Sequence, residues 1–169
     1  YFEKKYKIRY DKLTLRMFGV KGAELETALN EAKKIAKKKI SFNTEQKFSD
    51  IRLNMVYDNT TPKMIADEAV RAIVSRLKER IYTEEDEPLE KCLFDLLSLH
   101  RKKISFAESF TAGRVAAALI SVPGASAVVN EGITAYSNHA KMRRLGVKAE
   151  TLEKYGAVSS QTAYEMAAG

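Results

Sequence analysis

An acidic stretch that ends in proline, YTEEDEP at residues 82–88, divides the chain into two parts of different charge. Residues 1–83 hold 19 lysines and arginines against 11 aspartates and glutamates, a net charge of +8. Residues 84–169 hold 10 against 11, a net charge of −1. A charge step at a polar stretch with proline is typical of a domain boundary, and 169 residues suffice for two small domains. We therefore predict domains at 1–83 and 84–169.

The first part alternates between strand-like and helix-like patterns. Apolar residues occupy every second position in 12–18 and 50–58, which predicts two half-buried strands. They recur at helical spacing in 25–35 and 65–81, which predicts two helices. The threonine and proline at 61–62 predict the cap and first position of the second helix. The order strand, helix, strand, helix indicates a small two-layer α+β unit.

The second part continues the alternation with more helices. The predicted strands are KISFA and NEGITAY, residues 103–107 and 130–136. The predicted helices cover 89–97, 111–122, 137–146 and 148–156, and a last one is capped by Ser159. This order indicates an α/β layered fold.

Several classes of protein are disfavoured by composition. Cys92 is the only cysteine, so an intrachain disulfide and a cysteine-rich zinc site are excluded. With only two histidines, no metal site is expected. No apolar run approaches the length of a membrane span and no signal peptide is visible, so we expect a cytoplasmic protein without a membrane partner. The chain begins at Tyr1 rather than methionine, which is compatible with a piece of something longer.

The stretch SFAESFTAG, residues 105–113, reads as a strand that breaks into a small-residue turn and then a helix. Such a turn exposes Ser109 at the edge of a sheet, where the helix start supplies unpaired N–H groups suited to an oxyanion or a phosphate. A serine nucleophile needs a base. No Ser-His-Asp pattern is present, but a lysine can serve instead. YSNHAK, residues 136–141, follows the second strand, so Lys141 can emerge at the same sheet edge.

Simpler interpretations exist for the same residues. Ser109 or Thr111 could be a plain helix cap. Glu108 could interact only with the helix dipole, and Lys141 could be one more solvated lysine. Residue types alone favour these structural roles over catalysis.

Three segments together resemble the C-terminal domain of the CinA family, the competence/damage-inducible proteins. They are AESFTAG, then SVPGASAVVNEGITAYSNHAKMRRLGV, then ETLEKYGAVSSQTAYEMAAG. They follow, in order, the family pattern Glu-Ser-Cys-Thr-Gly-Gly, Pro-Gly-Ser-Ser, Gly-x-x-x-Tyr-Ser-Asn-x-x-Lys, Leu-Gly-Val and His-Gly-Ala-Val-Ser. The resemblance covers residues 84–169, and residues 1–83 look like the middle domain that precedes it.

The resemblance implies hydrolysis of the carboxamide of nicotinamide mononucleotide to nicotinic acid mononucleotide and ammonia. By carry-over, Ser109 attacks the amide carbon, Lys141 accepts its proton, and Tyr136 supports the transfer or holds the substrate. The residues implied to bind substrate or line the site are Glu108, Thr111, Gly113 and Asn138. No cofactor or metal is implied. The expected partner is a small nucleotide substrate, and homo-oligomerisation stays open.

This sequence departs from the family pattern. Phe110 replaces a cysteine, Tyr155 replaces a histidine, and Ala112 replaces a glycine. If the family glycine adopts a positive φ, Ala112 costs roughly 1 kcal/mol. The family domain also continues past Gly169 with a Thr-Gly-x-x-Gly-Pro segment that is not found here, which predicts a truncated α/β domain.

The alternative function is a nucleic-acid-binding or non-catalytic linker module in the first part. A net charge of +8 over residues 1–83 is compatible with phosphate-backbone binding. GVKG, residues 19–22, fits the Gly-x-x-Gly of KH domains. It is predicted between a strand and a helix rather than between two helices, however. A turn, a solvated lysine face and a linking role are therefore preferred, and nucleic acid is not the expected partner.

Overall fold

The computed structural model describes residues 8–169; residues 1–7 of the predicted first domain lie outside that range. The chain forms two compact units, Tyr1–Pro88 and Leu89–Gly169. The boundary follows Pro88 rather than Thr83, because the acidic stretch folds onto the first unit. The Asp86 carboxylate pairs there with Lys12 Nζ at 3.3 Å and with the guanidinium of Arg52.

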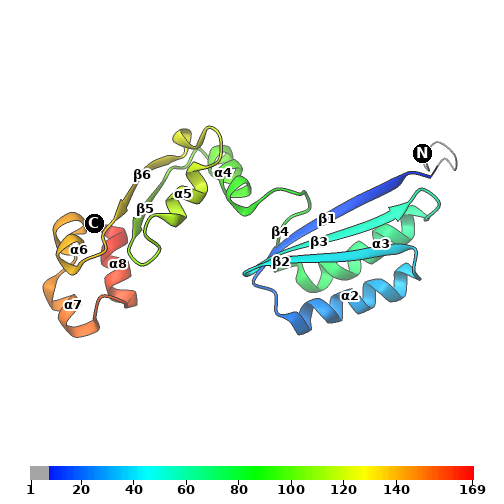
Figure 1. The fold of residues 1–169 in the computed structure, drawn as a ribbon, viewed down its shortest axis with the longest axis horizontal. Coiled ribbons are helices and arrows are strands. Elements are labelled where there is room, and N and C mark those ends of the chain that lie inside the picture. The colour runs from blue at the N-terminus through cyan, green and yellow to red at the C-terminus, as the bar shows by residue number, and fades with distance from the viewer. Residues whose placement is uncertain (1–7) are drawn as a thin grey trace. The chain divides into compact units, whose positions relative to one another are not determined.

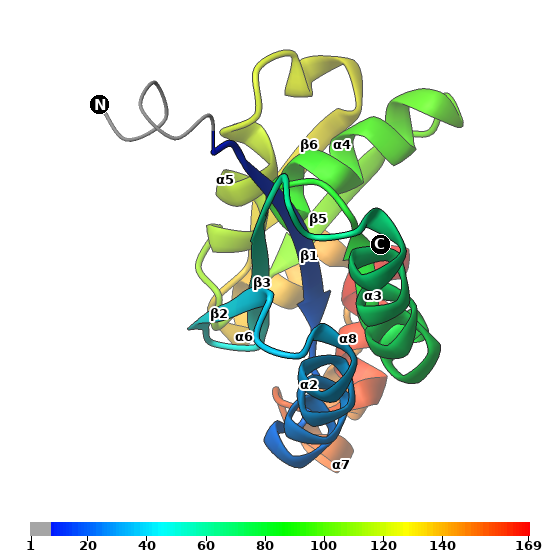
Figure 2. The ribbon, with the colours of Figure 1, turned by 90° about the vertical axis from the view of Figure 1, so that its right-hand side faces the viewer.

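The first unit is a four-stranded antiparallel sheet with two helices on one face (Figures 1 and 2). The strands lie in the order β2-β3-β1-β4. This is the split β-α-β topology, in which each helix connects two parallel strands that have one antiparallel strand between them. In chain order the elements are β1 (Tyr10–Phe18), α2 (Gly22–Ala36), β2 (Ile40–Lys47), β3 (Asp50–Asp58), α3 (Lys63–Leu77), a 3-10 helix η1 (Lys78–Arg80) and β4 (Ile81–Thr83).

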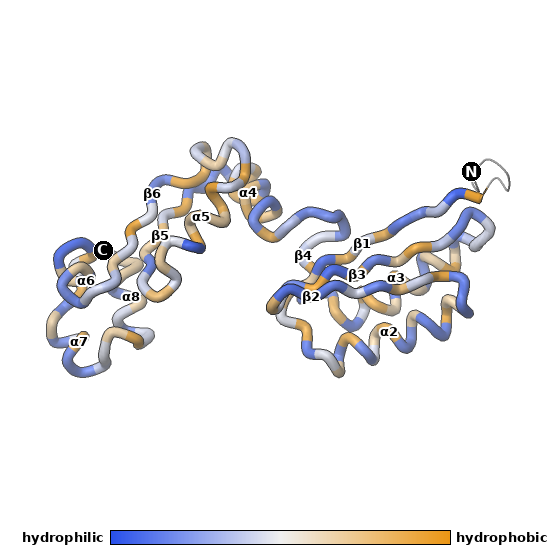
Figure 3. Tube along the Cα trace, in the orientation of Figure 1, coloured by the Kyte–Doolittle hydropathy of each residue, from blue (hydrophilic) through white to orange (hydrophobic). Residues whose placement is uncertain are grey.

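The core of this unit lies between the sheet and the helices. Large apolar side chains of β1 and β3 meet small ones on α2 and α3, which lets the helices approach closely. Apolar and polar residues alternate along α2 as an amphipathic helix requires (Figure 3). The core members include Leu15, Met17, Ile51, Leu53 and Met55 from the strands, and Ala28, Ala32, Ala66 and Ala69 from the helices.

The two predicted strands and two predicted helices of the first unit are confirmed, but β2 and β4 were not anticipated. β2 is an edge strand with one buried residue, Ile40, so its polar sequence carries little apolar alternation. Ile81 was assigned to the second helix, which in fact ends at Leu77. The prediction that Thr61 caps this helix is also wrong. Pro62 occupies the cap position of α3, and the Thr61 hydroxyl donates to the Lys39 carbonyl at 3.4 Å.

The second unit places a parallel pair of strands among five helices of the described chain, which confirms the mixed α/β class. Its helices α5 and α8 pack against the strands. Ser137 and Ser159 cap α6 and α8 by accepting N–H groups at 3.1 and 3.2 Å, the latter as predicted. The elements are α4 (Leu89–Leu99), β5 (Ile104–Glu108), α5 (Arg114–Ile120), a 3-10 helix η2 (Ala125–Ala127), β6 (Val129–Thr134), α6 (Asn138–Leu145), α7 (Ala149–Tyr155) and α8 (Ser160–Ala168).

A small core joins the strand ends of this unit to its last helices. Ala135, Leu145, Val147 and Met166 are buried together. The core therefore brings the end of β6, helix α6 and helix α8 into one cluster beside β5. Within residues 8–169, no helix has both the length and the apolar character needed to cross a membrane.

Candidate active site

The turn between β5 and α5 reverses the chain through two left-handed residues. The Ala112 N–H donates to the Ser109 carbonyl at 3.0 Å, which closes the turn. Ala112 has φ +53° and Gly113 has φ +86°. Ala112 thus meets the condition stated for a conformational cost at this position, and a residue with a Cβ is strained there. Helix α5 begins at Arg114 rather than at residue 111, because these two conformations are incompatible with a helix.

The side chain of Glu108 occupies the start of α5. Its Oε1 accepts the Ala116 N–H at 2.8 Å, and its Oε2 accepts the Val115 N–H at 3.2 Å. The Thr111 hydroxyl and the Gly113 N–H also favour the charged form of this carboxylate. Burial acts to raise the pKa of Glu108, but these hydrogen bonds outweigh it and hold the pKa below its usual value.

This arrangement decides the question of the helix cap. The cap residue of α5 is Gly113, and no side chain caps it from that position. The interpretation of Ser109 or Thr111 as a plain cap is therefore wrong, whereas the alternative that Glu108 lies at the helix start is confirmed. The N–H groups of Val115 and Ala116 are taken by protein, so they do not face an incoming oxyanion.

Ser109 lies at the wall of a pocket. One side of the pocket is formed by the end of β5 and the turn, residues 107–111. The other side comes from the α7–α8 connection and α8, with Ala157, Val158, Ser159, Ala163 and Met166. No binding role was predicted for these five residues, and only Ser159 had an assigned role, as the cap of α8. The signal that could have found Ala157, Val158 and Ser159 is the segment GAVSS, residues 156–160, which belongs to the family pattern.

Lys141 is buried, with 1% of its surface exposed, although the segment around it, YSNHAKMRR at residues 136–144, is mostly polar. Its Nζ donates to the Tyr136 carbonyl at 2.7 Å. In the part of the chain that the structure describes, no carboxylate pairs with this amine. The interpretation of Lys141 as a solvated lysine is therefore wrong. A buried amine without a carboxylate partner is unusual and marks a functional candidate.

A hydrogen bond joins the strand ends that carry Ser109 and Tyr136. The Ala135 N–H donates to the Glu108 carbonyl at 2.8 Å. Ser109 directly follows one partner of this bond and Tyr136 directly follows the other. Because Lys141 Nζ is held at the Tyr136 carbonyl, the amine lies at the sheet edge from which Ser109 emerges.

The remaining predicted residues are less closely connected. Among residues 8–169 the structure contains no hydrogen bond between Ser109 and Lys141, and catalytic hydrogen bonds are often long before substrate binds. Tyr136 is 74% exposed, and Asn138 is exposed at the first position of α6. Gly113 lies beside Thr134, whose Oγ1 would be 3.4 Å from an added Cβ. Over the described residues no three histidine, cysteine or acidic side chains are grouped to hold a metal ion.

The fold and the site define an α/β protein whose pocket lies at the carboxyl end of a parallel strand, where ligand sites of such sheets occur. Residues 86–169 match the family described as the CinA C-terminal domain. The chain belongs to the CinA family.

Relatives match both parts of the chain. A protein of the competence-damage inducible type from Acetivibrio thermocellus is 42% identical over 163 residues, which is 92% of this chain and 38% of the relative. A CinA-like protein from Fusobacterium nucleatum is 46% identical over 121 residues, 70% of this chain and 29% of the relative. This chain thus spans less than two fifths of the length of these curated relatives.

A solved structure was also matched. It is that of the competence/damage inducible protein CihA from Agrobacterium tumefaciens, with 44% identity, 48% of this chain and 49% of that chain covered, and a TM-score of 0.47.

Proposed function

We propose that the second unit contributes the nucleophile and the base of an amidohydrolase, which converts nicotinamide mononucleotide to nicotinic acid mononucleotide and ammonia. The observation that carries this proposal is the buried Lys141 amine at the sheet edge from which Ser109 emerges. A hydroxyl beside a desolvated amine is the pairing used by Ser-Lys hydrolases. The substrate is the one that the family resemblance implies.

In this mechanism the Ser109 Oγ attacks the carboxamide carbon while Lys141 Nζ takes the hydroxyl proton. The carbon–nitrogen bond then breaks, and the proton on Nζ goes to the departing ammonia. A water molecule attacks the resulting ester and gives one proton to Nζ. The ester bond breaks, the proton on Nζ returns to Ser109 Oγ, and the carboxylic acid product leaves and loses its remaining proton to water. Lys141 thus acts as base and acid in both halves of the reaction.

Donors for the oxygen of the tetrahedral intermediate have to come from the turn rather than from the helix. The N–H groups of Phe110 and Thr111 donate to no other residue in the described part of the chain, and both residues line the pocket. We propose these two amides as the oxyanion donors. The apolar wall formed by Val158 and Met166 suits a planar heteroaromatic ring.

Substitution of the pair tests this proposal in the protein that carries the whole CinA C-terminal domain. We expect Ser109→Ala and Lys141→Met each to reduce ammonia release from nicotinamide mononucleotide by roughly 10²–10⁴-fold or more, because each removes one partner of the same proton transfer. The double variant should be little worse than either single one. Tyr136→Phe should be milder if its hydroxyl only orients the others.

Circular dichroism serves as the folding control for these variants. Near wild-type turnover in folded Ser109→Ala refutes the assignment. An inactive wild-type protein would direct attention to Phe110 and Ala112, where restoring the family cysteine and glycine is the next variant to make.

We propose that the first unit links and orients neighbouring domains and does not recognise nucleic acid. The acidic stretch lowers the net charge from +8 over residues 1–83 to +4 over residues 1–88, and Asp86 covers Lys12 and Arg52. GVKG lies between β1 and α2, not between two helices. Gel shifts with RNA should show only weak binding that disappears at physiological salt, whereas salt-resistant binding would favour the KH-like alternative.

A further inference from the structure

The Glu108 carboxylate is buried and bound to the backbone at the start of α5. Its two oxygens accept the N–H groups of Ala116 and Val115 at 2.8 and 3.2 Å. The Thr111 hydroxyl and the Gly113 N–H also favour its charged form. Each carboxylate oxygen is therefore engaged by a backbone donor of α5. Only 6% of the residue is exposed. A side chain in this state has little capacity left for a substrate or for a proton in transfer.

The main chain of Glu108 is held by the strand pair β5 and β6. Glu108 ends β5 opposite Thr134 of β6, and its carbonyl accepts the Ala135 N–H at 2.8 Å. Glu108 therefore ties the strand pair to both the turn and the first turn of α5. Ser109 follows immediately, so its backbone is held upstream by the sheet and downstream by a turn that is bonded to Glu108.

We propose that Glu108 is a positioning residue, which holds the 109–113 turn so that the Ser109 hydroxyl and the Phe110 and Thr111 amides face the pocket. The proposal rests on the hydrolase function proposed above. It replaces the substrate-binding role first expected for Glu108. It also explains why the α5 start offers no anion site, because a buried anion from the chain itself already occupies that position.

The decisive variant is Glu108→Gln, which keeps the shape of the side chain but turns one acceptor oxygen into a donor group. That amide group then faces a backbone N–H, so one hydrogen bond is replaced by two opposed donors. We expect kcat for ammonia release to fall about 10–100-fold with KM within about twofold of the wild type, because misplacement of a reacting group slows the reaction without weakening uniform binding.

A second readout does not depend on the natural substrate. A fluorophosphonate reacts with an activated serine by forming an oxygen–phosphorus bond at Ser109 and releasing fluoride, while the hydroxyl proton goes to the base. We expect Glu108→Gln to slow labelling of Ser109 by about 10–100-fold as well. If the wild type releases no ammonia but its Ser109 is labelled rapidly, the substrate assignment fails. The positioning role of Glu108 is then tested by the labelling rate of Glu108→Gln relative to the wild type.

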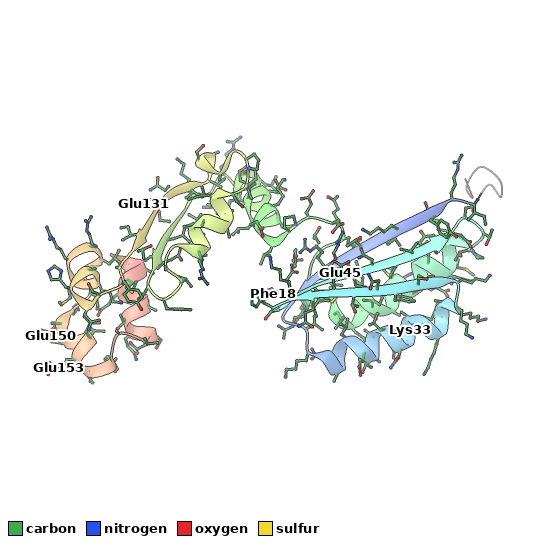
Figure 4. All side chains as sticks on the ribbon, viewed as in Figure 1. Phe18, Lys33, Glu45, Glu131, Glu150 and Glu153 are labelled. Atoms are coloured by element: carbon green, nitrogen blue, oxygen red, sulfur yellow. The ribbon has the colours of Figure 1, made fainter. Side chains whose placement is uncertain are left out.

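Two control variants separate positioning from general stability. Glu131→Gln makes the same chemical change at an exposed position of β6 (Figure 4) and should leave labelling and turnover unchanged. Thr151→Val removes the hydrogen bond from Thr151 Oγ1 to Glu165 Oε1, 2.8 Å long, elsewhere in the same unit. It should lower the melting temperature without slowing labelling below the melting transition.

The outcomes are exclusive. Folded Glu108→Gln with wild-type kcat and labelling rate overturns the proposal, as does a raised KM with unchanged kcat, which would assign Glu108 to substrate binding. Failure to label wild-type Ser109 at all also overturns it. If Glu108→Gln does not fold, Thr111→Val, which removes a single donor to the carboxylate, should slow labelling several-fold, and an unchanged rate there refutes the proposal.

Discussion

Replacing Ala112 with glycine is expected to stabilise the second unit, although it deletes a methyl group and touches no apolar core. Ala112 has φ +53°, a conformation in which the Cβ of an L-residue crowds the backbone, at a cost of about 1–2 kcal/mol. Glycine relieves that strain, but the unfolded chain gains freedom worth about 0.4–1 kcal/mol. The residue is exposed, so little burial is lost. The net gain is therefore about 1 kcal/mol in the free energy of unfolding.

The assay is thermal unfolding of the chain, followed for the transition of the unit Leu89–Gly169. For a unit of this size, about 1 kcal/mol corresponds to a rise in Tm of about 4–8 °C. The matched control is Ala117→Gly, the same substitution at an exposed position inside α5. There the backbone is right-handed, so glycine should destabilise by about 1 kcal/mol.

A rise in Tm for Ala112→Gly together with a fall in Tm for Ala117→Gly would indicate backbone strain at Ala112. If Ala112→Gly lowers Tm as Ala117→Gly does, the turn does not store strain at this residue and the reasoning is refuted. Equal stability of wild type and Ala112→Gly would mean that unfolded-state freedom cancels the relief, and would place the strain at the lower end of the range above.

Three further changes test other parts of the structure. Lys38→Gly should raise the Tm of the first unit, because Lys38 has φ +66° directly after the left-handed cap residue of α2, and a lowered Tm would contradict this. Glu165 has its pKa lowered by hydrogen bonds from the Lys148 N–H and the Thr151 hydroxyl, so its contribution to stability is complete above the unfolded value of 4.5 and is lost as pH falls through the folded value. Glu165→Gln should therefore flatten the fall in Tm on acidification below pH 4.5, and an unchanged pH profile would speak against it. Asp86→Asn should accelerate limited proteolysis within residues 84–88, because that stretch is anchored through this carboxylate, and first cleavage within residues 100–140 instead would count against the boundary.

The sequence by itself determined most of the regular elements and the position of the candidate nucleophile. Periodic apolar residues are a local signal, so β1, β3 and the longer helices could be read directly, as could Ser159 at the start of α8. The family pattern pointed to Ser109 and Lys141 without any geometry. The charge step at residues 82–88 likewise indicated two units.

Only the tertiary structure decided the roles of residues whose partners lie far along the chain. Lys141 belongs to a mostly polar segment of the sequence, yet it is buried because β6, α6 and α8 pack around the end of β5. Edge strand β2 forms because it pairs with β3, since its own sequence is polar and does not predict a strand. The sequence suggested that Glu108 either binds substrate or interacts only with the dipole of the following helix. Its hydrogen bonds to the N–H groups of Val115 and Ala116 depend on the left-handed turn at Ala112 and Gly113, which no pattern of residue types could specify.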